Sequence, residues 1–187
     1  TVSAQSSIGS GVGNIKKSYT LGITKAYLTR VGEGPFPTEQ NNAIGEKLGT
    51  IGNEFGTVTG RKRRCGWLDL VLLKQAVDIS GIHGIALTKL DVLDSFDKIK
   101  ICTAYKFDNK SFNYIPPNLN PKDNIEKKYI ELDGWNTTTR GCRNFNDLPN
   151  NAKKYISTLR ELTGIEISLL STSPEREDTI LFKDPFT

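Results

Sequence analysis

Histidine, cysteine and methionine are scarce or missing in this sequence. The one histidine is His83, and the three cysteines lie far apart with no C-x-x-C spacing, which argues against a zinc site and against a secreted disulfide framework. Reduced thiols in the cytoplasm are the simplest account of these cysteines. Methionine is absent even from the first position, so we expect the chain to be a piece of a longer protein.

Long apolar runs are missing as well. No stretch is long enough to cross a bilayer, and residues 1–10 lack the basic and apolar segments of a signal peptide. The 187 residues, 36% of them hydrophobic and 25% charged, suffice for one sizeable core, and we predict a single unit over residues 1–187 because no repeat or linker divides it. The net charge of +4 leaves nucleic acid and small phosphorylated ligands open as partners.

The spacing of apolar and turn-forming residues predicts a chain that mixes helices and strands. Helical spacing is found at residues 13–30, 43–48 and 67–80, and in a last helix that runs from a cap at Asn146 or Asp147 to Gly164. Strand patterns occur at residues 83–91, 99–107, 111–115, 129–132, 165–170 and 179–182. This mixture predicts an α/β fold, with a mixed sheet and flanking helices.

The stretch from Gly56 to Trp67 carries four consecutive cations, Arg61–Arg64, after a loop of glycines and threonines. Such a run repels itself unless anions lie among its side chains, so it is a candidate anion site. A solvated basic face is the plainer alternative. We expect the run to lie at the N-terminus of the helix predicted from Trp67, where free amides and the helix dipole favour bound anions.

Two further segments follow predicted strands and could share that ligand. In Thr88-Lys-Leu-Asp91, a carboxylate can accept hydrogen bonds from the N1–H and the exocyclic amine of guanine, while a lysine stem can lie along the base. The turn at Ser171–Ser173 offers small hydroxyl groups after another strand. Both segments lie where ligands bind in an α/β sheet, although each alone is also ordinary turn chemistry.

Four motifs occur in the order and at the spacing of a known enzyme family. They are VGEGPFPTE at 31–39, GNEFGTVTGRKRRCGW at 52–67, LTKLDVLD at 87–94 and KDPF at 183–186. They resemble adenylosuccinate synthetase, and the resemblance covers essentially the whole chain. It implies that the chain is the C-terminal portion of a larger α/β enzyme with a P-loop-like GTP site.

Members of that family join IMP and L-aspartate with hydrolysis of GTP, through a 6-phosphoryl-IMP intermediate and with Mg²⁺. The resemblance implies three groups of ligand-binding residues in this chain. The aspartate loop would be Thr57, Val58, Thr59 and Gly60, the IMP contacts Arg61 and Val31, and the GTP contacts Arg63, Lys89, Leu90, Asp91, Ser171, Thr172 and Ser173.

The resemblance also implies what these residues do not supply. The family's catalytic residues and its Mg²⁺ ligands are expected in an N-terminal part absent from this sequence, and His83 does not align with the family's catalytic histidine. The chain alone is therefore expected to be inactive, and the whole protein to be a cytoplasmic homodimer that binds neither nucleic acid nor membrane. Val58 and Ser173 depart from the family pattern, which usually has threonine and glycine there.

The sequence is also compatible with two kinds of binding module that are not part of an enzyme. A basic nucleic-acid-binding module would use Arg61–Arg64, but no aromatic residues are interleaved with them as a stacking platform. A stand-alone guanine-nucleotide-binding module would bind GTP by itself, and the missing phosphate loop predicts feeble binding.

Overall fold

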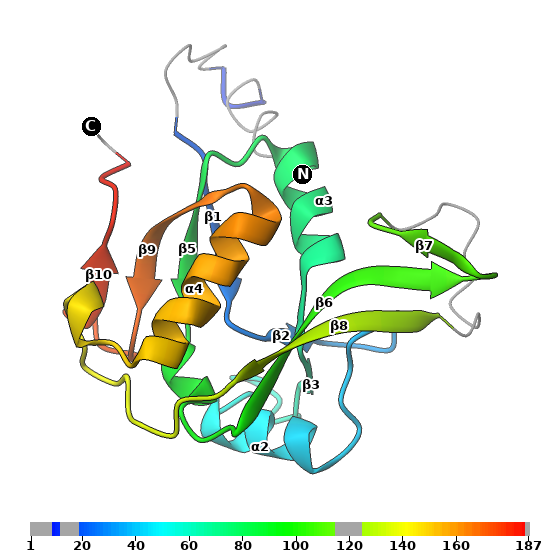
Figure 1. Ribbon diagram of the computed structural model, residues 1–187, viewed down its shortest axis with the longest axis horizontal. Helices are drawn as coiled ribbons and strands as arrows, with labels where there is room; N and C mark the ends of the chain where they lie inside the picture. The colour runs from blue at the N-terminus through cyan, green and yellow to red at the C-terminus, as the bar shows by residue number, and fades with distance from the viewer. Residues whose placement is uncertain (1–8, 12–18, 115–124, 186–187) are drawn as a thin grey trace.

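The computed structural model describes residues 9–11, 19–114 and 125–185, which build two sheets and a short two-stranded ribbon (Figure 1). The first sheet has the order β1-β5-β9-β10, formed by Leu21–Lys25, Gly84–Thr88, Glu166–Ser171 and Thr179–Leu181. Its first three strands are parallel and β10 is antiparallel to β9, so the sheet is mixed, as the sequence predicts. The carboxyl ends of β5 and β9 therefore meet at one edge.

A second sheet extends away from the first as a long arm (Figure 1). It consists of β4 (Leu68–Asp69), β6 (Lys98–Phe107), β7 (Lys110–Phe112) and β8 (Glu126–Asp133). The ribbon pairs β2 (Leu28–Arg30) with β3 (Arg64–Gly66), and two 3₁₀ turns occur at Leu90–Leu93 and Phe145–Asp147. The ribbon thus brings the basic run beside the segment that follows β1.

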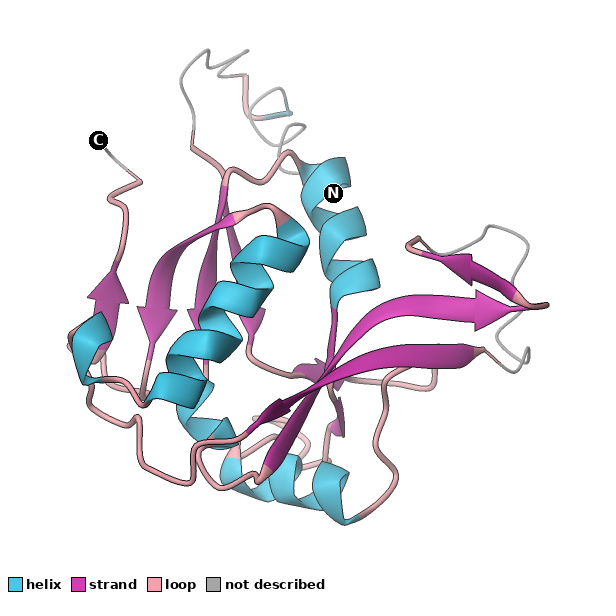
Figure 2. Ribbon diagram, in the orientation of Figure 1, coloured by secondary structure: helices cyan, strands magenta, loops and turns pink. Residues whose placement is uncertain are grey.

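Three helices complete the described part of the chain beyond residue 18. They are α2 (Ala43–Ile51), α3 (Leu70–Ser80) and α4 (Asn150–Thr163), and α4 lies over one face of the first sheet (Figure 2). Four apolar residues of α4 are buried in the core, Ala152, Tyr155, Ile156 and Leu159, whereas Leu162 near its end is exposed. The helix ends at Gly164, whose φ of +70° suits a residue without a side chain. Its start differs from the prediction, because Pro149 occupies the cap position and makes no side-chain cap bond.

The helix predicted over residues 13–30 is wrong for the residues that the structure describes. Leu21–Lys25 pair with β5 and Leu28–Arg30 pair with β3, while residues 13–18 lie outside the described part. Strand pairing across long sequence separations decides this segment, and its helical spacing is a local signal that competes with it. Residues 26 and 27 turn the chain between the two strands, with both side chains fully buried.

The helix predicted from Trp67 begins at Leu70 instead, and this changes the expected anion site. The buried Asp69 carboxylate caps α3, accepting from the amides of Val71 and Leu72 at 3.0 and 3.3 Å, and it also accepts from the Tyr105 hydroxyl at 2.5 Å. The chain's own carboxylate thus occupies the helix N-terminus. The prediction that the basic run and this helix end form one anion site is wrong.

We expect Asp69→Ala to lower the free energy of unfolding by about 2–4 kcal/mol, because it removes a helix cap and leaves the buried Tyr105 hydroxyl unsatisfied. Tyr105→Phe removes only one of the three bonds but leaves Oδ2 of the buried Asp69 carboxylate without this donor, so it should cost about 1–2 kcal/mol. Denaturant unfolding of both variants measures the difference. Equal losses would show that the cap contributes nothing.

Candidate guanine-nucleotide and aspartate-loop site

The basic run does not behave as one patch, because its side chains contact different parts of the fold. Three of the four cations form ion pairs with carboxylates of this chain: Lys62 with Glu46, Arg63 with Glu54, and Arg64 with Glu39. The anions that the sequence requires among these cations are therefore supplied internally. Arg61 is exposed and forms no ion pair with any residue that the structure describes.

Arg64 fixes the loop that follows β2. Its guanidinium donates to both carboxylate oxygens of Glu39 and also to the carbonyl oxygens of Gly32 and Gly34, at 2.8 and 2.7 Å. Val31, the predicted IMP contact, lies at the start of this loop with 78% of its surface exposed. Bidentate pairing with planar geometry is a property of arginine that lysine lacks, so Arg64 holds the shape of this loop.

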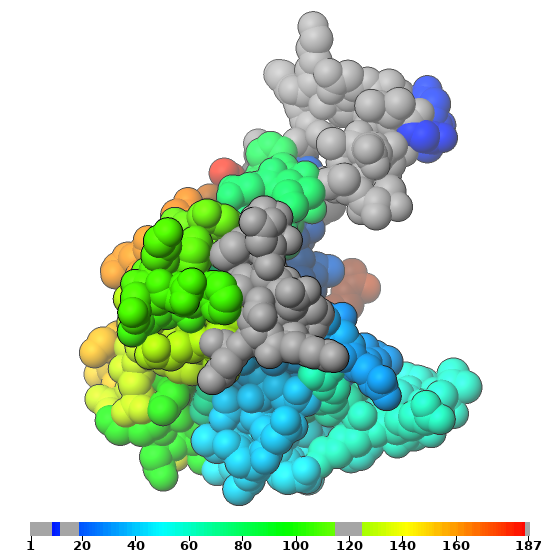
Figure 3. All heavy atoms as spheres, turned by 90° about the vertical axis from the view of Figure 1, so that its right-hand side faces the viewer, coloured from blue at the N-terminus to red at the C-terminus, as the bar shows by residue number. Residues whose placement is uncertain are grey.

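The predicted aspartate loop stands out from the body of the protein (Figure 3, turquoise). All four of its residues are exposed, Val58 at 97%: Thr57, Val58, Thr59 and Gly60. The loop is closed at its base, where the Gly56 amide donates to the Arg61 carbonyl and the Gly60 amide donates to the Gly56 carbonyl, both at 2.8 Å. Gly60 has a φ of +62°, so a residue with a side chain would be strained there.

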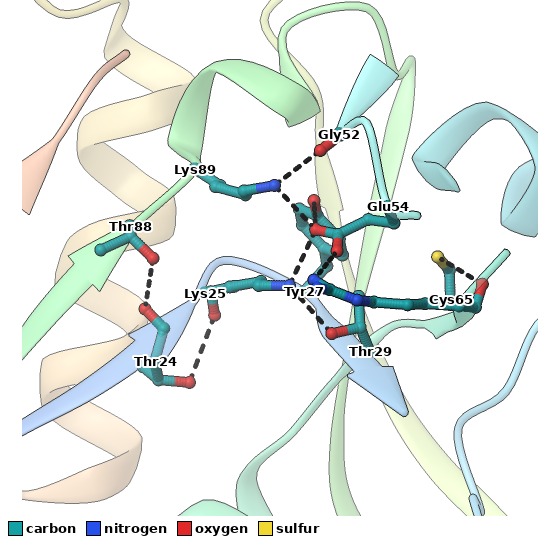
Figure 4. A network of polar contacts seen from close by, with 10 residues as sticks. Thr24, Lys25, Tyr27, Thr29, Gly52, Glu54, Cys65, Thr88 and Lys89 are labelled. Atoms are coloured by element: carbon teal, nitrogen blue, oxygen red, sulfur yellow. Dashed lines mark hydrogen bonds and ion pairs between the residues drawn. The ribbon is translucent and has the colours of Figure 1, made fainter. Parts of the chain in front are cut away.

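Glu54 is the buried centre of a polar network that sequence reasoning missed (Figure 4). Its side chain is fully buried, and Oε1 accepts from Lys25 Nζ at 2.8 Å, Lys89 Nζ at 2.9 Å and Tyr27 Oη at 2.6 Å. Oε2 accepts from Arg63 Nη1 at 2.9 Å. Burial alone would raise the pKa of Glu54, but the hydrogen bonds from Lys25, Tyr27 and Lys89 outweigh it and lower the pKa to about 2.

This pKa predicts how stability depends on acid. Because the folded-state value of about 2 lies below the ordinary 4.5, ionised Glu54 stabilises the fold above pH 4.5 by about 3 kcal/mol, and this contribution is lost as the pH falls from 4.5 toward 2. Glu54→Gln should therefore destabilise strongly at about pH 6 and much less at about pH 3. Thermal unfolding at both values measures this, with Glu46→Gln, which removes an exposed pair, as the control. A penalty that does not change with pH would contradict the assignment.

A cavity of about 590 Å³ lies at the carboxyl ends of β5 and β9. It brings together four of the residues predicted to contact GTP: Lys89, Asp91, Ser171 and Ser173. Arg140 also lines it, and no pattern in the sequence pointed to that residue. Its segment is held by Asp94, which accepts from the Thr139 amide and hydroxyl, both at 2.7 Å.

Lys89 and Asp91 differ in how their charges are used inside this cavity. The Lys89 ammonium is turned to Glu54 and to the Gly52 carbonyl, at 2.9 and 2.6 Å, so that its aliphatic stem is the part left for a flat ligand. No other described side chain hydrogen-bonds the Asp91 carboxylate, and burial together with Asp94 raises the pKa of Asp91. A half-buried carboxylate of this kind is matched to a ligand with paired N–H donors.

Three of the residues predicted to contact GTP do not line this cavity, namely Arg63, Leu90 and Thr172, and the Ser173 hydroxyl at its wall is bonded within the chain. The Arg63 guanidinium is paired with Glu54. Leu90 is fully buried in the core. The buried Thr172 hydroxyl donates to the carbonyl oxygens of Cys142 and Asp178, at 2.8 and 3.2 Å, and the Ser173 hydroxyl donates to the Asp178 carboxylate at 2.7 Å. These bonds fix the turn after β9, so the turn offers its shape and backbone to a ligand.

The described part of the chain contains neither a metal-binding cluster nor a membrane-spanning helix. In that part of the chain no three His, Cys, Asp or Glu side chains gather closely enough to hold a metal ion. No described helix is long and apolar enough to span a membrane. His83 is exposed and accepts a hydrogen bond from the Thr20 amide at 2.9 Å, which is a structural contact.

A cavity at the carboxyl ends of parallel strands, with a carboxylate and a lysine stem at its wall, is the arrangement expected of an α/β protein that binds a nucleotide. The model of the adenylosuccinate synthetase family matches residues 1–180, and the chain therefore belongs to that family. This confirms the resemblance, and with it the α/β fold class.

A solved structure gives the same result. The chain is similar to an adenylosuccinate synthetase from Plasmodium falciparum, described as fully ligated, with 36% sequence identity and a TM-score of 0.84. The match covers 95% of this chain and 43% of that one. The chain thus spans less than half the length of this solved relative.

Proposed function

We propose that this chain is the C-terminal part of a GTP-dependent adenylosuccinate synthetase, which ligates IMP and L-aspartate in AMP biosynthesis. The observation that carries the proposal is the cavity that joins Lys89, Asp91 and the turn at 171–173 at one sheet edge. Family membership over residues 1–180 supports the reaction class. The catalytic residues and the P-loop-like phosphate site belong, in this proposal, to a part of the protein outside these residues.

The cavity is proposed as the guanine site. The Asp91 carboxylate accepts from N1–H and the exocyclic amine of the base, and the Lys89 stem lies along its plane. The backbone of Leu90 and the turn at Ser171, Thr172 and Ser173 cover the base, while Arg63 meets the nucleotide from the basic run. Because adenine offers no N1–H to a carboxylate, this arrangement selects GTP over ATP.

The projecting loop is proposed to bind L-aspartate. Thr57, Thr59 and the amides of the loop donate to the two carboxylates, and the amide of Val58 serves where the family's threonine is replaced. Arg61 and Val31 face IMP, with Arg61 supplying the one guanidinium of the run that no carboxylate of the described chain neutralises. Several anions are thereby brought together without mutual repulsion.

Mg²⁺, the homodimer and a cytoplasmic location complete the proposal. Mg²⁺ would accompany the GTP phosphates, with its protein ligands in the part of the protein outside this chain. No nucleic acid or membrane partner is proposed. Internal pairing of Lys62, Arg63 and Arg64 speaks against the alternative of a basic nucleic-acid-binding module.

The test is adenylosuccinate formation by the longer protein that carries this chain, with IMP, L-aspartate, Mg²⁺ and either GTP or ATP. Activity that requires GTP supports the proposal. The chain alone should form no product and bind GTP only weakly. Steeply salt-dependent oligonucleotide binding without preference for guanine nucleotides would instead favour the nucleic-acid alternative.

A further inference from the structure

Glu54 lies between two sites that the proposed function keeps separate. One oxygen, Oε1, contacts Lys89 at the wall of the guanine cavity, and the other, Oε2, contacts Arg63 at the end of the projecting loop. The residue itself lies just before that loop in the sequence. One buried carboxylate thus holds Lys89 at the guanine cavity and Arg63, the residue at which the projecting loop rejoins the fold.

The contact with the guanine cavity fixes the direction of Lys89. This residue has a φ of +58°, which is uncommon for a residue with a side chain, and its ammonium is held by Glu54 and by the Gly52 carbonyl. Gly52 leaves the room that this arrangement needs, because a Cβ there would lie 2.2 Å from Tyr27 Oη. Glu54 therefore determines which part of Lys89 faces the cavity.

The contact with the loop is made by backbone and side chain together. The Arg63 amide donates to the Glu54 carbonyl at 2.9 Å, and the Arg63 guanidinium donates to the Glu54 carboxylate at 2.9 Å. An isolated bridge between Phe55 and Lys62 extends this pairing toward the loop. The two ends of the loop are consequently joined at Glu54.

Charge explains why a carboxylate is needed at this point. Lys25, Lys89 and Arg63 all converge on Glu54, so a neutral residue would leave three cations facing one another around a buried position. Removing one partner of a buried ion pair is strongly destabilising because the remaining charges lose their compensation. The cations would then move apart, and two of them belong to the ligand sites.

We propose that Glu54 is a positioning residue that couples the guanine cavity to the aspartate loop, by holding Lys89 and Arg63 on the two oxygens of one carboxylate. The inference rests on the proposed function for the identity of the two ligands, but the coupling itself is a property of the fold. A change at Glu54 must therefore affect both sites together.

The first test compares Glu54→Gln with Glu46→Gln in the longer protein that carries this chain. Glu46 pairs with Lys62 of the same run but lies outside both sites, so it is a matched control. For Glu54→Gln we expect the KM for GTP and the KM for aspartate each to rise roughly tenfold or more, with a smaller change in kcat, and neither to change in the control. A purely structural role would lower the amount of active enzyme and leave both KM values unaltered.

The second test measures amide hydrogen exchange in the ligand-free protein and does not depend on catalysis. Exchange at residues 56–64 and at 87–93 should accelerate together in Glu54→Gln and in neither segment in Glu46→Gln. Acceleration of one segment alone, or a rise in KM for one substrate alone, would overturn the coupling. If the unaltered protein forms no adenylosuccinate, the proposed function fails, and exchange still decides the coupling.

A milder variant covers the case in which Glu54→Gln does not fold. Tyr27→Phe removes one neutral donor to Glu54, and Tyr105→Phe removes the same type of bond to Asp69, away from the network. We expect exchange at both segments to accelerate in Tyr27→Phe and to remain unchanged in Tyr105→Phe. Equal behaviour of the two variants would count against Glu54 as the link.

Discussion

Arg61→Leu is expected to lower kcat/KM for adenylosuccinate formation by roughly a hundredfold or more without lowering stability. Arg61 is exposed, and no ion pair joins it to any described residue, so its loss costs the folded chain nothing. The loss of kcat/KM arises in the complex with substrates. There the planar guanidinium can bind a phosphate or carboxylate with two hydrogen bonds, whereas leucine can form none. Steady-state kinetics with IMP, GTP and aspartate varied in turn, together with thermal unfolding, measure both parts of this expectation.

Lys62→Leu is the matched control for Arg61→Leu. Lys62 is the next cation in the run, but it pairs with Glu46 on the surface of α2, and exposed pairs contribute at most about 1 kcal/mol. We expect its kinetics to remain close to those of the unaltered protein. Equal losses in the two variants would mean that the net charge of the run matters and that the position of Arg61 does not.

Asp91→Asn is expected to lower kcat/KM for GTP by roughly a hundredfold or more and to admit XTP as a substrate. The Asp91 carboxylate has no other described side chain to accept from, so it is available for the N–H groups of guanine. In Asp91→Asn, the side-chain NH₂ donor would face the 2-amino group of guanine, which is also a donor. Xanthine has a 2-oxo group at that position, which can accept a hydrogen bond from the NH₂. The ratio of kcat/KM values for GTP and XTP measures the change.

The control for Asp91→Asn is Asp97→Asn, an acidic residue shortly after the same turn. Asp97 is exposed and accepts from the side chain of Asn136 at 2.7 Å, away from the cavity. Its substitution should leave the nucleotide ratio unchanged. If Asp91→Asn retained full preference for GTP, the assignment of the cavity to guanine would be wrong.

The parts of the fold that the sequence predicts well are those in which local signals agree with tertiary contacts. The strand patterns at 99–107 and 111–115 are an example, because Asp108 and Asn109 between them adopt positive φ and join β6 to β7 in a tight hairpin turn. The returning strand is described at 110–112, while residue 115 of the predicted strand lies outside the described part. The helix prediction failed at residues 19–30 because the strands that pair with this segment lie far away in the sequence.

In the candidate site, too, the sequence predicts the residues whose position follows from a local signal and misses those placed only by tertiary contacts. Lys89, Asp91 and Ser171 could be grouped from the sequence because each follows a strand, and parallel strands bring such positions to one edge. Glu54 could not be recognised, since nothing local indicates that a glutamate in a polar turn is fully buried. Its cationic partners come from three separate segments, and only the folded chain brings them together.

The side chains of Lys62, Arg63 and Arg64 are bound to different parts of the fold, and this limits which residues of the segment can move. Arg64 is tied to the loop after β2, Lys62 to α2, and Arg63 to the buried network around Glu54. A segment attached at three successive residues to three different elements cannot shift without breaking all of these bonds. We therefore expect rearrangement on ligand binding to stop at Arg61, with residues 57–61 closing on the substrates from a base that stays fixed.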